Sequence, residues 1–171
     1  DLFERLALVL SRRVMDRARK GLYRAYVPRR ETVGYVRGRV DVRQHAMTPW
    51  KPMLPCEVQE HTADIPENQI LAWTLFSIAR SGLCTKHSMP TVRKAFREVS
   101  GAASLRRCDA DECLGALYNR LNEDYEPLHA LCRFFLEHAG PARTSGNQSM
   151  VPFLIDMAAL FETFVAEWLR I

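Results

Sequence analysis

Apolar residues recur at helical spacing along most of the chain. Phe3, Leu6, Leu10 and Val14 are three or four positions apart, which predicts an amphipathic helix over 2–20. The same spacing predicts four longer helices and a short one, over 64–82, 88–99, 125–139, 156–170 and 109–117. The chain is therefore expected to hold about six helices.

Residues 22–46 follow a period of two instead. Small or apolar side chains alternate with Arg and Tyr over 23–27, and with Arg and Asp over 39–43, as in half-buried strands. Residues 28–34 would form the turn between the two strands. We therefore expect a small antiparallel β ribbon near residues 22–46, with its arginines on one face, in an α+β fold that is mainly α.

Two capping patterns sharpen the predicted helix starts. Asp64 and Glu67 have the spacing of a capping box, with Pro66 suited to the first turn of a helix. Asp109 and Glu112 repeat the pattern before the short helix. Residues 140–149, rich in Gly, Ser, Thr, Asn and Pro, are the clearest loop of the chain.

The charges are distributed unevenly. The 171 residues are 47% hydrophobic and 26% charged, as in ordinary globular proteins, and carry a net charge of +4. Residues 12–43 hold eleven basic side chains, ten of them Arg, against three acids, a local net charge of +8. This segment either contacts phosphate or an acidic partner, for which Arg is well suited, or is a solvated basic face.

Several classes of function are disfavoured. The longest apolar stretch, 70–79, is too short to cross a bilayer, so no membrane is expected. The five cysteines and five histidines lack the spacing of a zinc site, and we expect reduced thiols in the cytoplasm. No nucleotide-binding glycine loop, nucleophile elbow or HExxH motif is present. The acids at 57, 60, 64 and 67 are better explained by a helix cap and a loop than by a metal.

Four segments carry a resemblance to a known family. They are Gly-Leu-Tyr-Arg-Ala-Tyr-Val at 21–27, Val-Arg-Gly-Arg-Val-Asp-Val-Arg at 36–43, Asp-Ile-Pro-Glu-Asn-Gln-Ile-Leu at 64–71, and the run at 153–165. In this order they resemble the McrC family, the nuclease-bearing subunit of 5-methylcytosine-dependent restriction systems. The resemblance extends over nearly the whole chain.

The resemblance implies a partner and a reaction. An McrB-like AAA+ GTPase would recognise methylated DNA and translocate it, while the McrC-like subunit would stimulate that motor and cut with a PD-(D/E)xK nuclease. Such a nuclease holds Mg²⁺ with paired carboxylates and uses a lysine to activate water. No strand pair with that pattern is found in this sequence, so no catalytic residue and no cofactor are assigned to it.

We therefore interpret the chain as a piece of a longer protein. It begins at Asp1 rather than Met and stops inside a periodic apolar pattern. Residues 1–149 would be the N-terminal and middle helical domain with its basic ribbon, and 150–171 the start of the nuclease domain. The piece would be non-catalytic and would link the GTPase to the nuclease. Alternatively, it is an adaptor that docks on an AAA+ NTPase without contacting DNA.

The candidate binding residues are six arginines of the basic segment. They are Arg24, Arg29, Arg30, Arg37, Arg39 and Arg43. They contact DNA or the partner, or else Arg37 or Arg39 pairs internally with Glu31 or Asp41 while Gly38 permits close backbone packing.

Three further polar residues have weaker readings. Glu162, on the last predicted helix, is either an accessory acid of the nuclease or a carboxylate that only solvates the helix. Glu67 and Asn68 are expected to be architectural: Glu67 would cap its helix and Asn68 would bond a neighbouring loop.

Overall fold

The computed structural model describes residues 2–82 and 84–139. These residues belong to one compact unit, 1–140, and the second unit, 141–171, lies outside the described residues. The predicted helix over 156–170, the predicted domain boundary at 149/150 and Glu162 also lie outside them and stay predictions.

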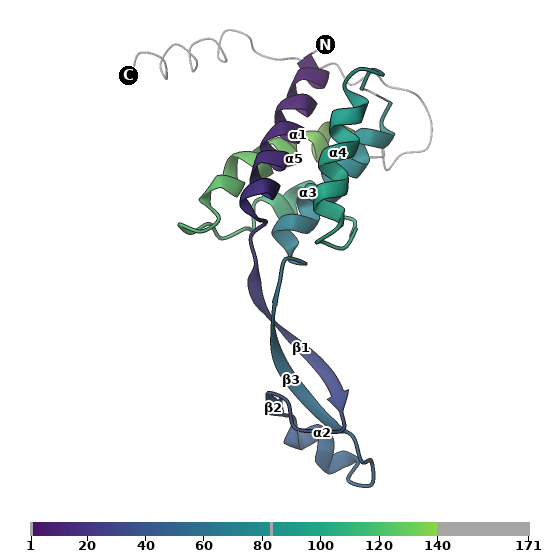
Figure 1. The fold of residues 1–171 in the computed structure, drawn as a ribbon, viewed down its shortest axis with the longest axis vertical. Helices are drawn as coiled ribbons and strands as arrows, with labels where there is room; N and C mark the ends of the chain where they lie inside the picture. The colour runs from purple at the N-terminus through teal and green to yellow at the C-terminus, as the bar shows by residue number, and fades with distance from the viewer. Residues whose placement is uncertain (1, 83, 140–171) are drawn as a thin grey trace. The chain divides into compact units, whose positions relative to one another are not determined.

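Four helices form the body of the described unit (Figure 1). They are α1 (Leu2–Lys20), α3 (Pro66–Arg80), α4 (Met89–Ser100) and α5 (Glu126–Ala139). Helices α1 and α3 each pack against the other three helices. All four helices were predicted from their apolar spacing, and the α+β, mainly α class is confirmed.

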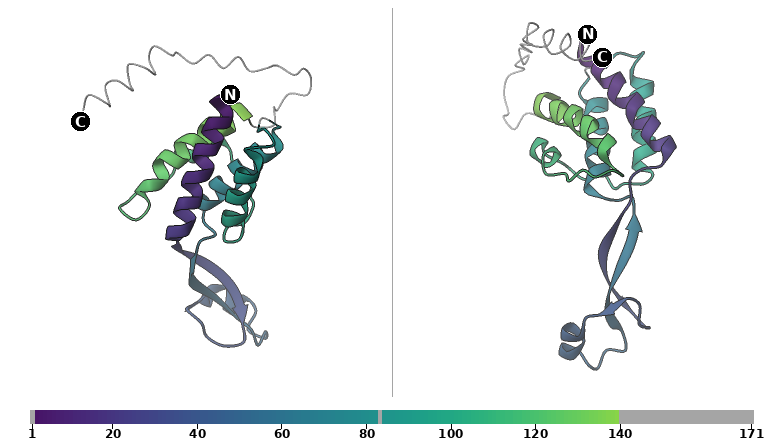
Figure 2. Two further views of the ribbon diagram at one scale, coloured as in Figure 1. Left: turned by 45° about the horizontal axis from the view of Figure 1, so that its top comes forward. Right: turned by 90° about the vertical axis from the view of Figure 1, so that its left-hand side faces the viewer.

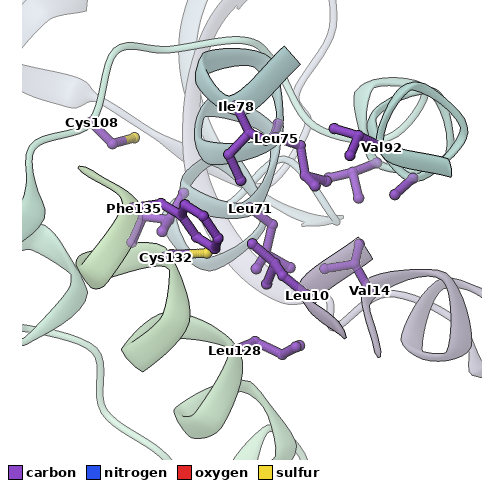
Figure 3. Close-up of a cluster of buried hydrophobic side chains, with 14 of the residues drawn as sticks. Leu10, Val14, Leu71, Leu75, Ile78, Val92, Cys108, Leu128, Cys132 and Phe135 are labelled. Atoms are coloured by element: carbon purple, nitrogen blue, oxygen red, sulfur yellow. The ribbon is translucent and has the colours of Figure 1, made fainter. Parts of the chain in front are cut away.

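The core lies where the apolar faces of these helices meet (Figure 3). Leu10 and Val14 of α1 lie beside Leu71 of α3, with Val92 of α4 and Phe135 of α5 completing the cluster. All five are almost fully buried. Burial of apolar side chains contributes roughly 1.5–3 kcal/mol each, which makes this cluster the main source of stability.

The short helix predicted over 109–117 is only a single 3-10 turn, η1 (Ala110–Cys113). Its predicted capping box is present, and the Asp109 amide donates to Oε1 of Glu112 at 3.0 Å. A second 3-10 turn, η2 (Glu123–Tyr125), leads into α5. Cys113 is the buried residue of η1, so little packing favours a longer helix there.

The capping box predicted for α3 is wrong. Ile65, in an extended conformation, precedes the helix and provides no side-chain cap, although Pro66 does open the first turn. Asp64 Oδ1 instead accepts hydrogen bonds from Gln69 Nε2 at 2.8 Å and from the Ser104 amide at 2.7 Å. These bonds lower the pKa of Asp64. The carboxylate thus ties the start of α3 to the loop after α4.

A three-stranded antiparallel sheet follows α1, and we call it the ribbon. It consists of β1 (Ala25–Val33), β2 (Arg39–Val40) and β3 (Leu54–Thr62), with β3 in the centre. The β1–β3 register runs from Ala25 opposite Thr62 to Val33 opposite Leu54. Helix α2 (Val42–Met47) packs on β3. Figures 1 and 2 show β1 and β3 twisting together away from the helices, with α2 near their far end.

The ribbon was predicted near 22–46, but its pairing differs. The predicted turn over 28–34 lies mostly within β1, and the partner strand is β3, which comes later in the chain. Pro28 fits because β1 is an edge strand and can lack one amide donor. The strand predicted over 39–43 stops at Val40, because Asp41 accepts from the Gln44 amide at 3.0 Å and starts α2.

One buried amide joins the ribbon to the helices. Asn68 Nδ2 donates to the carbonyl of Tyr23, just before β1, at 2.9 Å and to the carbonyl of Ala63, just after β3, at 2.7 Å. Its Oδ1 accepts from the Tyr125 hydroxyl at 2.7 Å, and that hydroxyl accepts from the Tyr23 amide at 2.9 Å. Asn68 is fully buried, which confirms its architectural reading.

Replacement of this amide should destabilise the unit. Asn68→Leu leaves two carbonyls and a hydroxyl without their partner, and we expect the free energy of unfolding to fall by about 3 kcal/mol. Tyr125→Phe, which removes only the hydroxyl, should cost about 1 kcal/mol. Urea unfolding followed by circular dichroism measures both, with the exposed Gln59→Leu as control. Equal stability of Asn68→Leu and Gln59→Leu would contradict this role.

Candidate interaction surface on the ribbon

The candidate arginines are divided between the two faces of the ribbon. Arg29, Glu31 and Glu60 share one face, because they alternate along paired strands. Arg29 Nη1 lies 2.9 Å from Glu60 Oε2, and Arg37 Nη1 lies 3.4 Å from Glu31 Oε1. The internal pairing weighed for Arg37 is therefore present. These two arginines are partly neutralised, and the prediction that all the arginines lie on one face is wrong.

The opposite face carries Arg30 and Arg39. Both are opposite Glu57 of the central strand, Arg30 from β1 and Arg39 from β2. Both are exposed, and neither has a carboxylate within 4 Å in the described part of the chain. On the same face, the rings of Tyr26 and His61 are 4.9 Å apart. This face can offer two cations to an acidic ligand.

The remaining two candidates lie at the ends of the ribbon. Arg24 precedes β1, close to the helices, and Arg43 belongs to α2. Both are exposed. A hollow of about 430 Å³ near α2 is lined by Arg39, Val40, Asp41, Val42, Arg43 and Glu57. Arg39 and Arg43 are thus brought to one hollow, while Arg24 is not part of it.

Gly38 allows β2 to approach β3. Its φ is +70°, and a Cβ at this position would overlap the backbone carbonyl oxygen of Glu57. A glycine is therefore required for both reasons. The close packing expected at Gly38 is confirmed, and it sets Arg39 directly opposite Glu57.

Large apolar side chains are also exposed near the end of the ribbon. Met47 and Trp50 are each 75% exposed, and Tyr35 is 65% exposed. Together with Val36, Val42 and Met53 we call these residues the tip patch. Their signal in the sequence was the presence of Met and Trp in a Pro-containing loop. Val42 lines the hollow together with Arg39 and Arg43, and exposed apolar side chains beside Arg are typical of protein-binding surfaces.

Metal ligands are not grouped in the described residues, and two buried thiols have raised pKa values. Within 2–82 and 84–139, no three His, Cys, Asp or Glu side chains are grouped to hold a metal ion. Burial raises the pKa of Cys108 and of Cys113 to about 11, so both thiols are protonated at neutral pH. Among the described helices, none is long and apolar enough to cross a membrane.

The described residues thus form a helical body that carries an antiparallel ribbon with exposed apolar side chains near its end.

The family follows from comparison with known proteins. The model of the family described as "McrBC 5-methylcytosine restriction system component" matches residues 1–171. The chain belongs to this family, and the resemblance inferred from its motifs is confirmed. No curated protein matches the chain.

Solved structures similar to the chain include two McrBC assemblies. The cryo-EM structure of the Thermococcus gammatolerans McrBC complex matches with a TM-score of 0.73 and 18% identity, over 99% of this chain and 48% of that one. A half-complex of T. gammatolerans McrB AAA+ hexamers with bound McrC matches with a TM-score of 0.65 and 17% identity, over 78% of this chain and 32% of that one. These matches show a shared fold, and the chain spans less than half of either protein.

The requirement for Gly38 is testable. Gly38→Ala should weaken β2–β3 pairing by about 2 kcal/mol, because of the left-handed φ and the overlap with Glu57. The Asp41 amide, which donates to the Pro55 carbonyl at 2.8 Å, should then exchange with solvent about 30-fold faster. Hydrogen exchange by NMR measures this. Gly34→Ala is the matched control, since only the Met53 sulfur lies within 4 Å, at 3.9 Å. Equal exchange in both variants would refute the claim.

Proposed function

We propose that this chain is part of an McrC-type subunit of a modification-dependent DNA restriction system and that its ribbon docks on an McrB-like AAA+ GTPase. The tip patch is the observation that carries the proposal. Membership of the McrBC family and the fold shared with an assembly of McrB AAA+ hexamers with bound McrC support the choice of partner.

A protein fits the ribbon better than DNA does. A protein partner that covers Met47 and Trp50 removes their apolar surface from water, which is favourable in free energy. Contact with phosphate gives no such gain. Arg29 and Arg37 are already paired with Glu60 and Glu31, which leaves fewer cations for a polyanion. The exposed arginines beside the tip patch would contact acidic groups at the rim of the interface and orient the partner.

In this proposal the chain links the motor to a nuclease. Asn68 of α3 and Tyr125 of η2 connect the ribbon to the helices, so a force on the ribbon would be passed to α3 and η2. The nuclease domain, predicted to begin at 150, would hold Mg²⁺ and cut the DNA. The described residues do not fit a Mg²⁺ site, because they contain no group of three suitable ligands. A subunit that restricts foreign DNA would work in the cytoplasm.

Loss of the tip patch should uncouple the partners. In the intact subunit, Met47→Ser with Trp50→Ser should weaken binding to the AAA+ GTPase at least tenfold, measured by biolayer interferometry, because large apolar anchors dominate interfaces. Stimulation of GTP hydrolysis should fall in parallel.

A matched variant controls for the loss of exposed apolar surface. Leu117 and Leu121 are exposed at 88% and 66% and lie on a loop of the helical unit. Leu117→Ser with Leu121→Ser should bind the GTPase as the wild type does. Wild-type affinity in the Met47/Trp50 variant would overturn the docking proposal.

The non-catalytic part of the proposal has its own test. The 171-residue chain, incubated with methylated duplex DNA, Mg²⁺, GTP and the GTPase partner, should leave the DNA intact in a gel assay. The full subunit under the same conditions serves as positive control. Metal-dependent cleavage by the 171-residue chain, with or without the partner, would refute this claim.

A further inference from the structure

A second basic segment lies in the helical unit, away from the ribbon in sequence. Between Glu67 and Glu98 the chain has no acidic residue. The same interval contains five basic side chains, Arg80, Lys86, Arg93, Lys94 and Arg97. This local surplus of positive charge is not apparent from the overall count, because the residues outside 12–43 together carry a net negative charge. Its only signal in the sequence is the missing acids.

Helix α4 gathers three of these cations around one hollow. Arg93 and Arg97 are one helical turn apart on α4, and Lys86 precedes the helix. With Met89, Pro90 and Phe96 they line a space of about 720 Å³. The three cations are exposed, and none has a carboxylate within 4 Å among the described residues. We call this hollow the α4 site.

Aromatic rings continue from the α4 site onto α3. The ring of Phe96 is 5.9 Å from that of Phe76, which is 5.5 Å from that of Trp73. The guanidinium of Arg80 lies 5.4 Å from the centre of the Phe76 ring. The other face of α4 is anchored in the core by Val92, so the cations are carried on a fixed element.

The acid that contacts the segment before α4 is already engaged. Glu4 Oε1 of α1 accepts from the Ser88 hydroxyl at 2.6 Å and from the Thr85 hydroxyl. The hydrogen bond from Ser88, followed by that from Thr85, lowers the pKa of Glu4. The carboxylate thereby fixes the segment that carries Lys86 against α1. It does not line the α4 site.

We propose that the α4 site binds the phosphate backbone of duplex DNA. Uncompensated cations on a rigid helix suit a polyanion, and contacts with phosphates release counterions. The apolar wall of Met89, Pro90 and Phe96 can pack against the sugars beside the phosphates. The proposal rests on the proposed function only in that the system acts on DNA. It assigns DNA to α4 and leaves the ribbon to the protein partner.

Neutralising the site tests the proposal. Lys86→Gln, Arg93→Gln and Arg97→Gln are combined in the intact subunit, and binding to a fluorescein-labelled 30-base-pair duplex is followed by anisotropy at several salt concentrations. We expect the dissociation constant to rise at least tenfold. The slope of log affinity against log salt should flatten by about 2 to 3, because about 0.9 counterion is released per phosphate contact.

A control variant removes the same charge elsewhere. Arg12, Arg107 and Arg120 are exposed, form no ion pair within the described residues and do not line the α4 site. Their combined change to Gln should weaken DNA binding less than threefold. Equal losses in the two variants, or none in the α4 variant, would overturn the proposal. So would competition by polyglutamate as strong as that by unlabelled duplex.

This result is separable from the docking test. If the α4 variant loses DNA but still binds the GTPase, and the Met47/Trp50 variant loses the GTPase, both proposals stand. If it loses DNA while the Met47/Trp50 variant still binds the GTPase, the α4 site stands and docking through the tip patch fails. Thermal unfolding of every variant checks that the helical unit is intact.

Discussion

The strands of the ribbon leave and re-enter the helical unit at two carbonyls, of Tyr23 and Ala63, which share one buried side-chain amide, Asn68. The hydroxyl of Tyr125 completes the group, and Arg17 of α1 lies 5.1 Å from the centre of the Tyr125 ring. Helices α1 and α3 and the turn η2 therefore meet the ribbon at one place. A ribbon held there by hydrogen bonds between buried groups can carry a partner without an apolar core of its own.

Local sequence patterns predicted the elements that local interactions determine, namely the helices. The apolar spacing identified α1, α3, α4 and α5, since each buries one face. The partner of β1 could not be predicted, because alternation shows that a segment is a strand and not which strand it pairs with. The cap assigned to Asp64 failed for a similar reason: Ser104, forty residues away, competes for the carboxylate. Capping rules, which consider only neighbouring residues, cannot predict that contact.

The candidate site was predicted only in part. From the sequence, Arg37 could either contact a partner or form an internal ion pair. In the structure it pairs with Glu31. The sequence indicated close backbone packing at Gly38, and the backbone that approaches it is that of Glu57. Trp50 was missed because a loop residue gives no periodic signal. The α4 site was missed because a dense run of basic residues draws attention to 12–43. The cations of α4 are less dense and are recognisable only because acidic residues are absent around them.

The central claim is that the chain separates its two contacts, with the GTPase on the tip patch and DNA on α4. Hydrogen–deuterium exchange of the intact subunit, measured with each partner in turn, tests this most directly. The account predicts that the GTPase slows exchange in peptides covering 34–53 and that duplex DNA slows it in peptides covering 84–100. Protection of 34–53 by DNA, or of 84–100 by the GTPase, would contradict it.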